Sequence, residues 1–255
     1  MKHRLSIVLT LILISACGPT TVALDNAGGV PIEGPLEGMM FVQLPGGVTQ
    51  IGSVASEIGR RDDEDYDLVS VSPFEIMTTE VTQRMWEGVM GSLPGCMMMS
   101  IHQFGNDFPV IEASYCQVLE FVEKLNVMDP VYEYRIPTES EWEYACRAGS
   151  NSRFFWGDSD NEAIASVHCW YSENACDSLH VVAQLEPNAW GLYDMAGNVE
   201  ECVYVDLDQG YYSILKGGSY MSEISGLRSA RRRIEEPCGG GTIGFRLVRV
   251  KRDDY

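Results

Sequence analysis

The second half of the chain shows little regular hydrophobic periodicity, and this feature constrains the fold more than any other. From Ser150 onward the sequence is rich in Gly, Asn, Asp and aromatic residues, which favour turns and irregular loops. Such loops must satisfy their buried backbone groups through metal ions, disulfides or dense side-chain hydrogen bonding. The sequence therefore predicts few helices, short strands and long ordered loops in this half.

The first half carries clearer signals for helices. Thr79 or Thr82 can cap a helix that buries Trp86. The apolar spacing over residues 113–125 is typical of a second helix that lies on a core. The run Thr-Glu-Ser-Glu at 138–141 is a capping box and predicts the start of a third helix.

Short strands are expected between these helices. Residues 37–47 should form a first strand with 49–53 as its hairpin partner, and further strands are expected at 68–76 and just before Pro137. The charged loop at 58–67 is interpreted as solvated surface, with a calcium role for its carboxylates as the alternative. Because no Pro/Ser-rich linker divides the chain, we expect one mixed domain.

The first residues are typical of an export signal. Lys2 and Arg4 precede a short apolar run that cannot span a bilayer, and Ile-Ser-Ala-Cys ending at Cys17 resembles a bacterial lipobox. The predicted organisation is a signal peptide (1–16), a lipidated flexible tether (17–36) and one domain (37–255). An ordinary secretory signal is the alternative. The lipoprotein interpretation places the chain in the cell envelope, lipid-anchored to the membrane, and to the outer membrane in a Gram-negative source.

Charge and cysteine content narrow the partners and the chemistry. The formal net charge of −19 repels nucleic acid, so no nucleic-acid partner is expected. Apart from Cys17 the chain has seven cysteines, and an odd number leaves at least one thiol unpaired or paired between chains. Cys169 and Cys176 enclose a short polar loop and are the expected local disulfide. Zinc is disfavoured because no two cysteines have the spacing of a zinc knuckle.

Six motifs, spread over nearly the whole domain, resemble one known family. They are Phe-Glu-Ile-Met-Thr-Thr-Glu-Val-Thr-Gln at 74–83, Arg-Ile-Pro-Thr-Glu-Ser-Glu-Trp-Glu-Tyr-Ala at 135–145, Phe-Trp-Gly-Asp at 155–158, Pro-Asn-Ala-Trp-Gly-Leu-Tyr-Asp-Met-Ala-Gly-Asn-Val at 187–199, Lys-Gly-Gly-Ser-Tyr at 216–220 and Gly-Phe-Arg-Leu-Val at 244–248. In this order they resemble the formylglycine-generating enzyme, or sulfatase-modifying factor, family. The resemblance implies a single α+β domain of C-type-lectin-like fold, with a small antiparallel sheet.

The same resemblance identifies where catalysis would take place. Enzymes of this family oxidise a sulfatase cysteine to formylglycine with Cu(I) held by two cysteines after the Gly-Gly-Ser-Tyr motif. Ser222 and Leu227 stand at those two positions here. Since Cu(I) prefers soft thiolates, copper is not expected as a cofactor and no catalytic residue is assigned. Cys238 lies in the same region, but one thiolate is not two.

Calcium is the cofactor that the resemblance favours. The family holds a loop ion with two side chains and two backbone carbonyls, which here correspond to Asp194, Gly197, Val199 and Glu201. All four provide hard oxygen ligands. The alternative is that Asp194 and Glu201 only cap the loop. A second family ion site, near Ser166, lacks the expected asparagine.

Two further groups of residues were considered as sites. Arg228, Arg231 and Arg232 form a basic run that could bind an anion, although such arginines also pair with neighbouring acids such as Glu200. The histidines at 102, 168 and 180 are scattered, with no helical pair to hold a non-haem iron.

The leading functional hypothesis is a membrane-anchored, non-catalytic binding or scaffold module that presents its loops to a protein, peptide or glycan. The alternative is an active oxidase of the family, which modifies a sulfatase or another envelope substrate.

Overall fold

The computed structural model describes residues 29–95, 104–203, 213–235 and 240–252. Cys17, the signal sequence, His102 and Cys238 lie outside these residues. The described helical segments are α1 (Gln83–Met90), α2 (Tyr115–Met128), α3 (Glu139–Arg147), α4 (Glu162–Ala165) and the 3-10 turn η3 (Ile224–Leu227). The described strands are β1 (Ile32–Glu33), β2 (Met40–Leu44), β3 (Gly47–Ile51), β4 (Asp67–Val71), β5 (Phe74–Met77), β6 (Tyr132–Arg135), β7 (Glu200–Val203), β8 (Ser213–Lys216), β9 (Arg232–Glu235), β10 (Ile243–Gly244) and β11 (Val248–Lys251).

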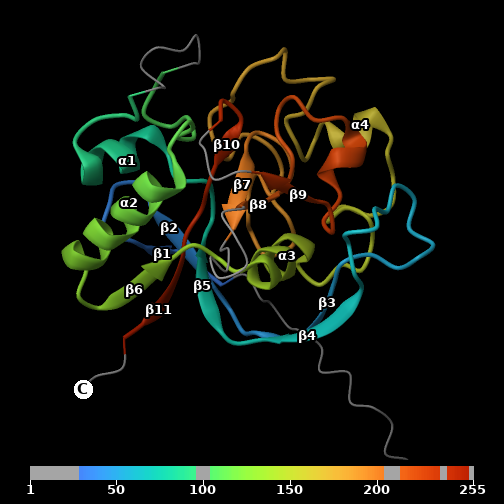
Figure 1. Ribbon diagram of the computed structural model, residues 1–255, viewed down its shortest axis with the longest axis horizontal. Coiled ribbons are helices and arrows are strands. Elements are labelled where there is room, and N and C mark those ends of the chain that lie inside the picture. Colours follow the sequence, from blue (N-terminus) through green and yellow to red (C-terminus); the bar gives the residue numbers. More distant parts are fainter. Residues whose placement is uncertain (1–28, 96–103, 204–212, 236–239, 253–255) are drawn as a thin grey trace, which may run out of the picture.

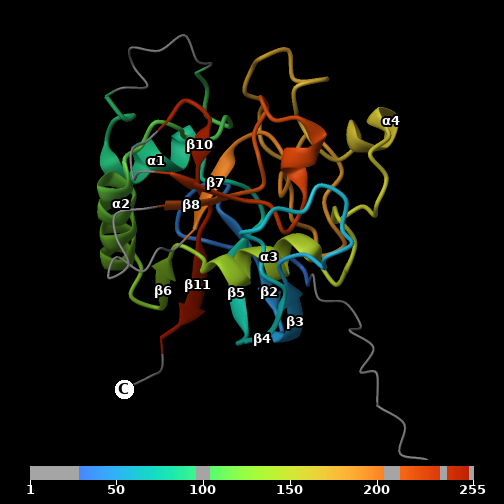
Figure 2. The ribbon, with the colours of Figure 1, turned by 45° about the vertical axis from the view of Figure 1, so that its right-hand side comes forward.

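These strands form three sheets in the described part of the chain. The largest has the order β1-β2-β5-β11-β6, a second has the order β10-β7-β8-β9, and β3 pairs with β4 in a two-stranded ribbon. Every pairing is antiparallel except that of β10 with β7. Figures 1 and 2 show α1 and α2 together on one side of the domain, well apart from α3 and α4. The predicted α+β class with short strands and few helices is confirmed.

The three predicted helix starts are also confirmed. The hydroxyl of Thr82 accepts a hydrogen bond from the third residue of α1, which makes it the N-cap. Ser114 and Gln117 form a capping box at the start of α2. Thr138 and Glu141 do the same at α3, so local sequence sets all three helix N-termini.

The large sheet is covered on both faces, because successive side chains of a strand point to opposite sides. On one face Phe41 belongs to a core that includes Trp86 of α1 and Phe121 of α2, whose rings stack with centroids 5.3 Å apart. On the other face Val42 belongs to a core that includes Trp142 of α3. Burying both faces makes this sheet the rigid centre of the domain.

The predicted hairpin between residues 37–47 and 49–53 is wrong. β2 pairs with β1 and β5, whereas β3 leaves the large sheet and pairs with β4. Gly46 lies between them with φ of 72°, and a Cβ atom there would lie 2.4 Å from the carbonyl oxygen of Val71. The predicted strand at 68–76 is likewise two strands, separated at Ser72 and Pro73, and Pro73 has no N–H to donate to a ladder.

Within the described residues, no helix is both long and apolar enough to cross a membrane.

Candidate functional site

The glycine turn that follows β8 brings together the two positions at which the family resemblance predicts copper ligands. Gly218 has φ of 69°, and a Cβ atom there would lie 2.8 Å from the Leu227 side chain and 3.1 Å from the Ser222 hydroxyl. The turn thus requires glycine at position 218. It also places the side chains of residues 222 and 227 against the backbone of Gly218. Residues 222 and 227 are therefore neighbours in space, as a two-ligand site would require.

Neither side chain at this turn can bind copper. The Ser222 hydroxyl accepts a hydrogen bond from the backbone N–H of Ser219 at 2.9 Å, which stabilises the turn. Leu227 is buried in an apolar cluster with Phe154 and Tyr171. The Ser222 hydroxyl is a hard donor that already bonds the backbone, and the Leu227 side chain has no donor atom. Neither therefore provides the soft donor that Cu(I) prefers.

Other sulfur atoms do not replace the missing pair within the described residues. Cys169 lies in the same apolar cluster as Leu227, but its thiol donates to the carbonyl of Ala165 at 3.2 Å. Burial, reinforced by the charge of Asp194, raises the pKa of Cys169 to about 12. Burial also raises the pKa of Cys202 to about 11. Burial thus disfavours the thiolate form of both residues, which is the form that binds a metal.

The predicted disulfide between Cys169 and Cys176 is absent, since both residues are free cysteines. Cys169 is buried and its thiol is directed to the carbonyl of Ala165, whereas Cys176 is exposed and has φ of 52°. Short sequence separation alone does not bring two sulfur atoms into bonding geometry.

Acidic side chains converge around Arg246, two residues beyond β10. The Arg246 guanidinium forms a bidentate ion pair with Glu201, with contacts of 2.6 to 2.9 Å, and both groups are buried. Glu201 also accepts a hydrogen bond from Trp142 at 2.8 Å. Asp194 and Glu80 are buried close by, and burial together with the neighbouring carboxylates raises the pKa of Glu80 well above its usual range.

This cluster contains two of the four predicted calcium ligands. Burial raises the pKa of Asp194 to about 6, and one carboxylate oxygen of Glu80 is buried without a hydrogen-bond partner. Three buried carboxyl groups thus lie near one guanidinium, and a bound cation would favour their ionised forms, although the described acidic side chains do not by themselves form a metal-binding group. Calcium would be held by Asp194 and Glu201 with the carbonyls of Gly197 and Val199, and it would neutralise the loop. Calcium binding stays a prediction. It requires Glu201 to contact the ion and Arg246 at the same time.

Most of the basic run is already paired with acids. Arg228 donates to Glu57 at 2.7 Å and to Glu64 at 2.5 and 2.8 Å, and Arg232 lies 3.0 Å from Glu139. Burial and the nearby charge of Arg61 lower the pKa of Arg231. Anion binding by Arg228, Arg231 and Arg232 stays a prediction. The alternative, that these arginines pair with acidic side chains, holds for Arg228 and Arg232. Glu200, the acid named as a partner for such arginines, pairs with the next arginine of the run, Arg233, at 2.5 Å.

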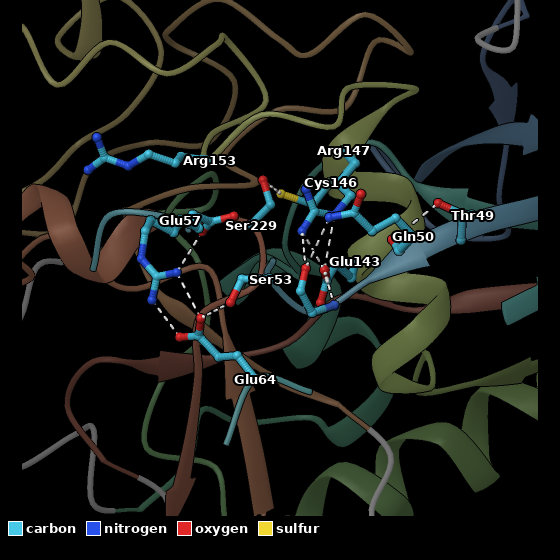
Figure 3. A network of polar contacts seen from close by, with 12 residues as sticks. Thr49, Gln50, Ser53, Glu57, Glu64, Glu143, Cys146, Arg147, Arg153 and Ser229 are labelled. Carbon is cyan, nitrogen blue, oxygen red and sulfur yellow. Dashed lines mark hydrogen bonds and ion pairs between the residues drawn. The ribbon is translucent and has the colours of Figure 1, made fainter. Parts of the chain in front are cut away.

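Sequence reasoning missed a buried charge network that joins distant segments (Figure 3). Glu143 of α3 accepts from Arg147 at 2.8 Å and from Lys216 of β8 at 2.9 Å, and all three side chains are almost fully buried. Glu64, which was expected on solvated surface, is buried against Arg228 and Ser53. The four-residue spacing of Glu143 and Arg147 was a local signal for their pair.

The two described histidines lie in ring stacks. His168 lies parallel to Trp156, with centroids 5.5 Å apart, and His180 lies parallel to Trp170 at 3.7 Å. Among the described residues, no three His, Cys, Asp or Glu side chains are grouped so that they could hold a metal ion.

The fold and the glycine turn define a loop-rich α+β domain with short, mostly antiparallel strands. The family described as "Sulfatase-modifying factor enzyme 1-like domain" matches residues 32–251, and the chain belongs to this family.

Relatives within the family differ in the roles that their names record. The chain is 24% identical over 236 residues to the chaperone protein LppX of Paenibacillus barcinonensis, covering 72% of this chain and 82% of that protein. It is 31% identical over 144 residues to the formylglycine-generating enzyme of Streptomyces coelicolor, covering 45% and 46% of the two chains. The structure of PvdO from Pseudomonas aeruginosa superposes with a TM-score of 0.75 at 24% identity, covering 87% of this chain and 98% of that one. That likeness confirms the predicted fold.

Proposed function

We propose that this protein is an envelope lipoprotein, anchored through Cys17, whose domain binds another envelope protein and assists its folding or assembly without redox chemistry. The observation that carries the proposal is the turn after β8, where Ser222 serves the backbone and Leu227 fills the core. A relative named as a chaperone supports a binding role for the domain. The lipobox-like start of the chain supports the envelope location.

The segment at 219–234, which follows the glycine turn, supplies a surface for such a partner. Met221 and Ile234 lie on this segment with exposed fractions of 59% and 53%. The carbonyl of Ser222 accepts a hydrogen bond from the backbone N–H of Ser172, which holds this segment against the loop that contains Ser172. Exposed apolar side chains on a fixed backbone are typical of surfaces that bind proteins.

Site-specific cross-linking in intact cells tests this proposal. A photoreactive amino acid replaces Met221 in the full chain, and a matched variant carries it at Val127, which is exposed on α2 and lies far from the turn in sequence. We expect discrete cross-linked partner proteins from position 221 and none of them from position 127. We also expect the captured protein to become less abundant or misassembled when the gene for this chain is deleted.

Equal labelling from both positions would contradict a specific binding surface. An unchanged amount and assembly state of the captured protein in the deletion strain would contradict the assisting role.

A further inference from the structure

A pocket of about 380 Å³ lies away from the glycine turn and shares no lining residue with it. Its walls come from the start of β2, the turn before α1, and two later loops. Its lining includes Glu37, Met40, Met85, Asp107, Val182 and Tyr193. A volume of this size falls within the range of sites for small ligands or single long side chains.

The pocket has an apolar interior and an acidic rim. Met85 is buried, and Met40 and Val182 are half-buried, so these aliphatic side chains, together with threonine side chains from the turn before α1, line the pocket below the rim. Glu37 and Asp107 stand at the rim, with side chains 80% and 60% exposed. An apolar channel below carboxylates matches a ligand that has an aliphatic stem and a cationic head.

The rim keeps a net negative charge after its internal pairing is counted. Arg84 contacts Oε1 of Glu37 and lies 3.0 Å from Oδ1 of Asp107. The second oxygen of each carboxylate takes no part in these two ion pairs. Two carboxylates against one guanidinium, on a chain of net charge −19, attract cations and repel anions.

The wall of the pocket is held in place by the buried charge cluster behind it. The backbone N–H of Ala183, a lining residue, donates to Asp194 at 2.7 Å. The carbonyl of Tyr193 accepts from Arg246 at 2.9 Å. Walls that are fixed before the ligand arrives reduce the entropy lost on binding.

We propose that this pocket binds an alkylammonium group, with the aliphatic stem between Met40, Met85 and Val182 and the ammonium at the free oxygens of Glu37 and Asp107. Two sources share this chemistry, namely a small free amine and a lysine side chain presented by a polypeptide. The site does not depend on the proposed assembly role, since it lies on other elements than the segment after the glycine turn.

Isothermal titration of the full chain tests the proposal with pentylammonium, its neutral isostere 1-pentanol, and Nα-acetyl-lysine methylamide. We expect pentylammonium to bind at least about threefold more tightly than 1-pentanol, because only the ammonium uses the rim and exposed ion pairs contribute modestly. Tighter binding of the lysine derivative than of pentylammonium would identify a polypeptide as the source, and the reverse order a free amine.

Variants locate the site. The double substitution E37Q/D107N should weaken pentylammonium binding at least about threefold, whereas E120Q/D160N, which also neutralises two exposed, ion-paired acids, should leave it unchanged. In methyl NMR spectra of the wild-type chain, which need no variant to fold, pentylammonium should shift Met40 and Met85 and leave the buried Met195 unmoved. Equal binding of amine and alcohol, equal loss in both double variants, or unmoved Met40 and Met85 signals would overturn the proposal.

Discussion

Replacing Arg228 by methionine should destabilise the domain strongly. Arg228 and Glu64 are both fully buried, and the guanidinium makes two of the hydrogen bonds to the Glu64 carboxylate. After R228M the carboxylate keeps its hydrogen bond from Ser53 but loses its counter-charge. Breaking a buried pair from one side costs about 3–5 kcal/mol. For a domain of this size that corresponds to a drop of roughly 6–20 °C in the thermal midpoint.

Urea unfolding monitored by tryptophan fluorescence measures this loss. The matched control is R61M, because Arg61 is exposed and lies 3.7 Å from its partner Asp63, so its removal should cost less than about 1 kcal/mol. The double variant R228M/E64M removes both charges and should recover most of the stability lost in R228M. A loss in R228M no larger than that in R61M would refute the reasoning. A double variant as unstable as R228M would show that packing, and not the unpaired carboxylate, causes the loss.

Four further results are expected. Burial raises the pKa of Glu64, but the hydrogen bonds from Arg228 and Ser53 and the charge of Arg228 together outweigh it and lower the pKa, so the free energy of unfolding should fall as the pH drops below 4.5, and less so in R228M/E64M; identical pH profiles would contradict this. L227A should cost about 2–5 kcal/mol in urea unfolding, because it opens a cavity in a buried cluster, and a neutral effect would place Leu227 outside the core. G197A should unfold or lose more than about 2 kcal/mol by the same assay, since φ is 79° and the added Cβ would lie 2.1 Å from a carbonyl oxygen. Calcium at a hundredfold excess over its dissociation constant should raise the stability by about 2.7 kcal/mol in calorimetry and leave D194N unaffected, whereas no response in the wild type would contradict the predicted ion site.

The features that could be predicted from the sequence are those that depend on residues close together in the chain. The N-caps of α1 and α3 were predicted because a capping residue lies within a few residues of the helix that it starts, whereas α2 was predicted from its apolar spacing alone. The family motifs predicted the fold and the places of Ser222 and Leu227. The hairpin between β2 and β3 was predicted wrongly because Gly46 permits a change of sheet that strand alternation does not encode.

What the sequence could not predict depends on contacts between distant segments. Glu64 and Arg228 are separated by 164 residues, so the charged loop around Glu64 showed only its polar composition. The pocket bordered by Glu37 and Asp107 is likewise assembled by the fold. Cys169 and Cys176 are close in sequence, but the buried environment of one and the exposed position of the other keep them apart.

The central claim is that this domain keeps the family fold without its copper chemistry. The most direct measurement incubates the full chain with Cu(I), oxygen and a peptide containing Cys-x-Pro-x-Arg, and follows the peptide by mass spectrometry. The double variant S222C/L227C serves as a copper-binding control, because it restores both thiol groups at neighbouring positions. The account predicts an unmodified peptide with the wild-type chain and Cu(I) binding only in the double variant. Formylglycine formation by the wild-type chain would contradict it.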